Sequence, residues 1–170
     1  MYVRLFEKLR NSGVDFLVLG GAAVSLHGFP RMTTDIDILL RNTPENIARF
    51  ASAMRGWGAG LGADITPAEL QGPGCVRIVE DFPLDVFTLL NGKPYEYFED
   101  GAVKYVLAGE VEVRCLAIAD LIELKKSTLR EKDELDVAAL RRLQVSPESD
   151  LPPTIALDLP PNLSGDTPSS

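Results

Sequence analysis

The sequence has few of the side chains that build disulfide frameworks or zinc sites. It holds two cysteines and one histidine in 170 residues. Cys75 and Cys115 lie far apart, with no CxxC pair or Cys/His cluster around them, so neither a disulfide framework nor a zinc site is indicated. We interpret both cysteines as buried thiols in a reducing compartment, and we expect a cytoplasmic protein.

The chain also lacks long apolar runs and an excess of basic residues. No stretch approaches the roughly 20 apolar residues of a membrane span, and no cleavage pattern of small residues follows the apolar stretch near the N-terminus. We therefore expect no membrane partner. Lys and Arg number 17 against 25 Asp and Glu, a net charge of -8, which argues against general nucleic-acid binding. A nucleotide or a specific RNA could still bind through magnesium and a few well-placed cations.

Composition changes sharply near the C-terminus. Residues 146–170 hold six of the twelve prolines, four acidic residues and no Lys, Arg or aromatic residue. Such a segment buries too little apolar surface to offset its ordering entropy. We predict one packed domain over residues 1–145 and a mobile, Pro-rich acidic tail over 146–170.

One stretch near the N-terminus predicts a unit of strand, glycine turn, helix and strand. Phe16–Leu19 are all apolar, as in a buried strand, and Gly20 and Gly21 break that run where a helix over 22–26 can begin. The chain returns as a second strand over 35–40. The glycine turn would present backbone N–H groups at a helix N-terminus, where a phosphate can bind.

The second strand carries two carboxylates. Because strand side chains alternate faces, Asp35 and Asp37 point the same way, about 6.5 Å apart, while Ile36 and Ile38 point into the core. Like charges this close raise each other's pKa unless a cation lies between them, and a hard divalent cation prefers oxygen ligands. The alternative is the solvated face of a half-buried sheet, but the neighbouring glycine turn favours a site for a metal-bound nucleotide.

A third carboxylate interrupts an apolar strand later in the chain. Asp85 lies within the strand predicted over 84–90, which follows another over 76–80. It is a candidate third metal ligand, and an edge-strand or turn-proximal aspartate is the alternative. A hairpin is predicted from strands over 103–107 and 111–116.

The last predicted elements are two helices. Lys125 falls in the middle of an apolar stripe of the first, so it must snorkel or meet an anion. A second helix extends to about Gln144, and its first turns carry charged residues that a solvated face explains as well as function does: Arg130, Lys132, Asp133 and Asp136.

Three segments together resemble the nucleotidyltransferases of the DNA polymerase β-like superfamily, most closely the AbiEii-like branch. They are LGGAAVSLHGFPRMTTDIDILL, the strand Leu84-Asp85-Val86-Phe87 and the ending LIELKKSTLREKDELDVAAL, and they reach across most of residues 15–140. The resemblance implies an α/β fold with a small mixed sheet flanked by helices. It also implies magnesium-dependent transfer of a nucleoside monophosphate from an NTP to an acceptor hydroxyl, with release of pyrophosphate.

The resemblance assigns roles to the carboxylates and the glycines. Asp35, Asp37 and Asp85 would hold two magnesium ions, one bound by all three and the other by Asp35 and Asp37. Gly20 and Gly21 would contact the nucleotide phosphates.

The same resemblance adds charged residues near the C-terminal end of the domain. A motif of the family in this region, K…R.KD, maps onto Lys125, Arg130, Lys132 and Asp133, and Lys125 would reach the triphosphate. Arg31 is a further phosphate or acceptor candidate, and so is His27, which is equally explained as a structural turn residue.

Two other classes of function stay open. The chain could be a non-catalytic module that binds a nucleotide or a partner, as one half of a toxin–antitoxin pair. A metal-dependent phosphohydrolase is a third reading, against which the lack of further His or Asp ligands counts. The acceptor is also open: a small molecule, the end of a transfer RNA or a protein side chain.

Overall fold

The computed structural model describes residues 2–30, 32–60, 62, 65–71, 74–126 and 131–145. Within these ranges the chain forms seven helices, a six-stranded mixed sheet and a separate two-stranded pair. The predicted α/β fold, a mixed sheet flanked by helices, is therefore confirmed. The tail predicted over 146–170 lies outside the described residues.

The large sheet brings together the strands that carry the predicted carboxylates. Its strands, in spatial order, are β3 (Cys75–Val79), β4 (Pro83–Phe87), β2 (Ile36–Leu40), β1 (Phe16–Leu19), β8 (Val111–Cys115) and β7 (Val103–Leu107). The pairs β2/β4 and β1/β8 are parallel, and the other three are antiparallel. β5 (Leu89–Leu90) and β6 (Lys93–Pro94) form the small pair.

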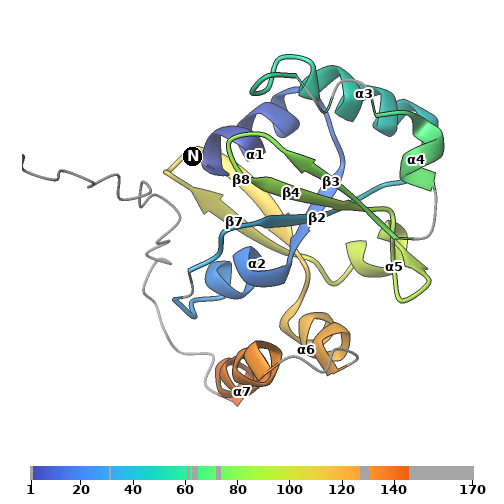
Figure 1. Ribbon diagram of the computed structural model, residues 1–170. Coiled ribbons are helices and arrows are strands. Elements are labelled where there is room, and N and C mark those ends of the chain that lie inside the picture. Colours follow the sequence, from blue (N-terminus) through green and yellow to red (C-terminus); the bar gives the residue numbers. More distant parts are fainter. Residues whose placement is uncertain are drawn as a thin grey trace, which may run out of the picture.

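Helices cover both faces of the large sheet (Figure 1). α1 (Tyr2–Asn11) and α3 (Pro44–Met54) lie on one face. On the other face α2 (Gly20–Leu26) packs against β1 and β2, α6 (Ile118–Lys126) packs against α2, and α7 (Glu131–Val145) packs against α6. The short helices α4 (Pro67–Gln71) and α5 (Tyr95–Glu99) complete the set. No helix among the described residues is long and apolar enough to cross a membrane.

The core follows the predicted strand patterns. All four residues of β1 are buried, as expected for a central strand covered on both faces. In β2, Ile36 and Ile38 are fully buried, whereas Asp37 on the opposite face keeps some exposure. Burial of one face fixes the register of the strand, so Asp37 is held toward α2.

Four local predictions were wrong. α2 begins at Gly20, before the predicted start, because Leu19 at its N-cap is extended and Gly20 takes a left-handed φ of 63°. β2 begins at Ile36, so Asp35 lies just before the strand. The strand predicted over 84–90 is split at Thr88 into β4 and β5. Cys75 is exposed, because β3 is an edge strand, while Cys115 is buried as predicted.

Candidate active site

One row of paired residues crosses four strands and carries the candidate site. Leu19 of β1 pairs with Asp37 of β2, Asp37 pairs with Asp85 of β4, and Asp85 pairs with Arg77 of β3. Side chains at directly opposite positions of neighbouring strands lie on the same face of the sheet. The structure therefore brings together Asp37 and Asp85, which are distant in sequence, and adds an arginine that the sequence analysis missed.

Asp37 lies at the centre of this row. Burial raises the pKa of its carboxyl from 3.8 to about 6, with further contributions from the Asp35 and Asp85 carboxylates. The Lys125 and Arg77 cations act in the opposite sense, but they do not cancel the rise in this pKa. The ionised form of Asp37 is thus disfavoured in the folded protein, and a bound cation would stabilise it.

Gly20 gives the Asp37 carboxylate its space at the start of α2. A Cβ atom built on Gly20 would lie 1.9 Å from Oδ2 of Asp37, much closer than any real contact. Gly20 also has the left-handed φ that disfavours other residues. The first turn of α2 therefore lies against the Asp37 carboxylate. Gly21, the second residue of this helix, is buried.

Gly20→Ala is expected to destabilise the protein and to displace the Asp37 carboxylate. Gly109→Ala is the matched control, because Gly109 has a φ of 79° but no atom within 4 Å of its added Cβ. The control should lose about 1 kcal/mol for its backbone conformation alone. Urea denaturation should show a clearly larger loss for Gly20→Ala, and equal losses would mean that the contact with Asp37 does not matter.

Asp85 is held by an arginine. Nε of Arg77 donates to Oδ1 of Asp85 at 2.7 Å, and Nη2 donates to Oδ2 at 2.6 Å. The Asp85 side chain is 8 % exposed and the Arg77 side chain 55 % exposed. This bidentate ion pair fixes the orientation of the Asp85 carboxylate and compensates its charge.

Asp35 lies just before β2, where hydrogen bonds from Thr33 position it. Oγ1 of Thr33 donates to the backbone oxygen of Asp35 at 2.9 Å and to its Oδ1 at 3.1 Å. The Tyr2 hydroxyl donates to the Thr33 backbone oxygen at 3.1 Å. Burial raises the pKa of Tyr2, and the charge of Asp35 raises it further, so α1 begins close to this end of the site.

The donor set suits magnesium, but the carboxylates are not gathered around one point. Three carboxylates are the hard oxygen ligands that magnesium prefers. Burial, and then the Asp35 and Asp85 charges, raise the pKa of Asp37, and a bound cation would act in the opposite sense. Across the described ranges, however, no three His, Cys, Asp or Glu side chains are grouped to hold a metal ion. By their donor atoms Asp35 and Asp37 could hold magnesium, and Asp85 could join them only if Arg77 shared or released it.

Lys125 makes ion pairs within the helical layer. Its Nζ lies 2.8 Å from Oδ1 of Asp133 and 2.6 Å from Oδ2 of Asp136. Both aspartates are buried, so the solvated face proposed for the start of α7 is wrong for them. The contact of Lys125 with a triphosphate stays a prediction. The Lys125 cation lowers the pKa of Asp37, so the two side chains interact electrostatically.

The remaining predicted cations are less well defined. Arg31 and Arg130 lie outside the described residues, and Lys132 is described only by its place in α7. His27 follows α2 and bonds inward. Its Nε2 lies 2.8 Å from the Leu116 carbonyl oxygen and its Nδ1 lies 2.8 Å from the Tyr105 hydroxyl, which favours the structural role.

We expect His27 to stay neutral at physiological pH. A carbonyl only accepts, so Nε2 donates to Leu116 and Nδ1 accepts from Tyr105. Burial lowers the pKa of His27 below 6.5, so the stability that depends on it is present above about pH 6.5 and is lost as the pH falls. NMR titration of this single imidazole should give a midpoint below that of the urea-unfolded chain, and a higher midpoint would contradict the assignment.

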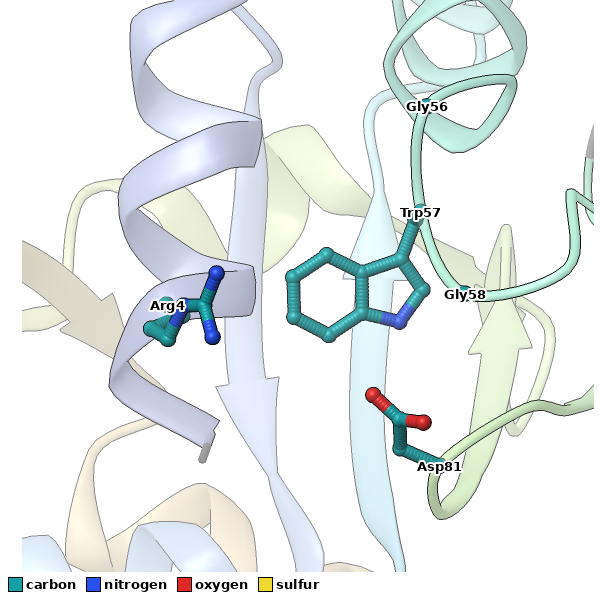
Figure 2. Close-up of a pocket in the computed structure, with 5 residues that line it drawn as sticks. All are labelled: Arg4, Gly56, Trp57, Gly58 and Asp81. Atoms are coloured by element: carbon teal, nitrogen blue, oxygen red, sulfur yellow. The ribbon is translucent and has the colours of Figure 1, made fainter.

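A pocket of about 390 Å³ lies apart from the carboxylate row. It is lined by Arg4 of α1, by Gly56, Trp57 and Gly58 after α3, and by Asp81 between β3 and β4. Figure 2 shows the Arg4 guanidinium and the Asp81 carboxylate both directed toward the Trp57 indole. None of the residues that line this pocket belongs to the predicted site. The predicted site lies on the face of the sheet where Asp37 contacts α2.

Comparison with known proteins gives no family assignment for the chain. No protein-family model matches it, and no curated protein has a significantly similar sequence.

Proposed function

We propose that the protein is a magnesium-dependent nucleotidyltransferase that moves a nucleoside monophosphate from an NTP to an acceptor hydroxyl and releases pyrophosphate. The observation that carries this proposal is the pairing of Asp37 with Asp85 on neighbouring strands, with Gly20 of α2 against the Asp37 carboxylate. On this proposal the protein acts in the cytoplasm, where NTPs and magnesium are present. The acceptor is a small molecule, a transfer RNA end or a protein side chain.

Each element of the site has a role in this reaction. Asp35 and Asp37, later joined by Asp85, would hold magnesium, which neutralises the triphosphate and lowers the pKa of the acceptor hydroxyl. Backbone N–H groups at Gly20 and Gly21 would orient the phosphates toward the carboxylates. Each Asp85 oxygen accepts one bond from Arg77 and retains a second lone pair, with which it would take the acceptor's proton.

A non-catalytic binding module is the second candidate, and the Arg77–Asp85 pair favours it. A carboxylate with both oxygens bound to a guanidinium is already compensated and needs no metal. Such a module would bind a nucleotide or a protein partner, as in a toxin–antitoxin pair, without transfer.

Label transfer separates these candidates. The purified protein is incubated with magnesium, a cell extract as acceptor, and each NTP labelled at the α-phosphate in turn. The test variant is Asp35→Asn/Asp37→Asn. Asp100→Asn is the matched control, because Asp100 is an exposed aspartate at the end of α5.

Transferase activity predicts that the α-label moves to an acceptor with the wild type and Asp100→Asn, and not with the double variant. Parallel reactions with label at the γ-phosphate should release pyrophosphate; inorganic phosphate would instead indicate hydrolysis. Nucleotide binding without transfer of any label would favour the binding module.

A further inference from the structure

We propose that Arg77 is a phosphate-binding residue of this site, and that it exchanges Asp85 for the triphosphate and thereby opens Asp85 to magnesium. The inference rests on the proposed function and adds a residue that the sequence analysis did not identify.

The position of Arg77 is the first support. β3 is an edge strand of the sheet. The Arg77 side chain is 55 % exposed, although the Asp85 carboxylate that it binds is only 8 % exposed. An exposed arginine stem can rotate away from the edge without disturbing the core. Asp85, in contrast, is fixed in β4 between β3 and β2.

The strand pairing is the second support. Arg77 pairs with Asp85 across β3 and β4, and Asp85 pairs with Asp37 across β4 and β2. Directly opposite side chains lie on one face of the sheet. The guanidinium therefore lies on the same face as the two carboxylates to which the proposed function assigns the metal.

The chemistry of the pair explains the exchange. Arginine carries five N–H donors in a planar fork, which match phosphate as well as carboxylate, and Asp85 uses Nε and Nη2. A magnesium ion on Asp85 would repel the adjacent guanidinium, while a triphosphate would attract it. Binding of phosphate and binding of metal at Asp85 should therefore promote each other.

Two affinities measured on Arg77→Gln test this exchange. The first is the affinity for inorganic tripolyphosphate with magnesium, by calorimetry, which does not depend on the base. The second is the affinity for Mn²⁺ alone, by EPR titration. Arg77→Lys keeps the charge without the fork, and Arg10→Gln removes an exposed arginine at the end of α1 as the matched control.

We expect Arg77→Gln to bind tripolyphosphate about tenfold more weakly, because it loses a charge-assisted bond, and to bind Mn²⁺ several-fold more tightly, because Asp85 loses its competing cation. Arg77→Lys should lie between Arg77→Gln and wild type, and Arg10→Gln should match wild type. A purely structural Arg77 would weaken both affinities together, and that result, or no change in either, overturns the inference. If the wild type binds neither probe, the proposed function fails as well.

Discussion

Asp37→Asn is expected to abolish nucleotidyl transfer and, in the metal-free protein at pH 7, to raise the free energy of unfolding by up to about 3 kcal/mol. On the proposed function, transfer is lost because Asp37 is the central carboxylate of the row and would hold the metal. The stability rises because burial and the neighbouring carboxylates raise the pKa of Asp37 from 3.8 to about 6, and each pKa unit corresponds to about 1.4 kcal/mol. Asparagine has nearly the same shape without the charge.

The pH dependence of this gain has a definite sign. Well below pH 3.8, Asp37 is protonated in the folded and unfolded chains, so its charge makes no difference to stability. As the pH rises toward 6, the unfolded chain releases this proton while the folded chain retains it, and wild-type stability falls. The difference between Asp37→Asn and wild type should therefore grow from pH 4 to 6 and level off above.

Thermal and urea unfolding without metal, from pH 4 to 8, measure this difference. Asp100→Asn is again the control and should stay within about 0.5 kcal/mol of wild type. Saturating Mg²⁺ should stabilise the wild type and not Asp37→Asn. Equal stability of wild type and Asp37→Asn at every pH would contradict the raised pKa of Asp37 in the folded protein.

Lys125→Met should destabilise the protein by about 3–5 kcal/mol, because it removes a cation that pairs with two buried carboxylates. The Lys125, Asp133 and Asp136 side chains are 11 %, 10 % and 3 % exposed. Lys126→Met is the matched control: Lys126 is 52 % exposed and pairs with Glu123 at 3.5 Å. It should change stability by less than about 1 kcal/mol.

A triple variant tests the origin of the Lys125→Met loss. Lys125→Met with Asp133→Asn and Asp136→Asn also removes the two carboxylate charges and should recover much of the stability lost in the single variant. Urea denaturation measures all three proteins. A loss below about 1 kcal/mol for Lys125→Met would mean that water compensates these aspartates.

The unit of strand, glycine turn, helix and strand that carries Asp35 and Asp37 could be predicted from the sequence because its signals are local. An apolar run, two glycines and an alternating Asp–Ile strand lie within 16–40, and each pattern identifies its own element. Asp85 was found by the same logic, since a carboxylate within an apolar strand needs a partner. The pairing of Asp37 with Asp85 depends on the strand order, which the sequence patterns do not give. The resemblance implied only that the two aspartates would share a metal site.

Arg77 was missed because its position depends on the register of a hairpin. The sequence suggested a connection at 81–83, whereas the turn lies one residue earlier and pairs Arg77 with Asp85. The predicted connection would instead place Arg77 opposite Phe87, two positions further along the strand and out of reach of Asp85. The alternation Val76-Arg77-Ile78, with Ile78 buried and Arg77 exposed, was the available signal.

The sequence indicated that Lys125 could need an anion, but it did not identify which one. A lysine in an apolar stripe needs an anion, but the choice between a ligand and the chain's own carboxylates depends on how two helices pack. In the structure α7 lies against α6 and supplies Asp133 and Asp136.

The most direct test of the carboxylate site is a crystal structure with Mn²⁺ and a non-hydrolysable NTP analogue. We predict anomalous density for Mn²⁺ at Asp35 and Asp37 and phosphates against the backbone N–H groups of Gly20 and Gly21. Nucleotide bound instead in the Trp57 pocket, with no Mn²⁺ at the carboxylates, would contradict the account.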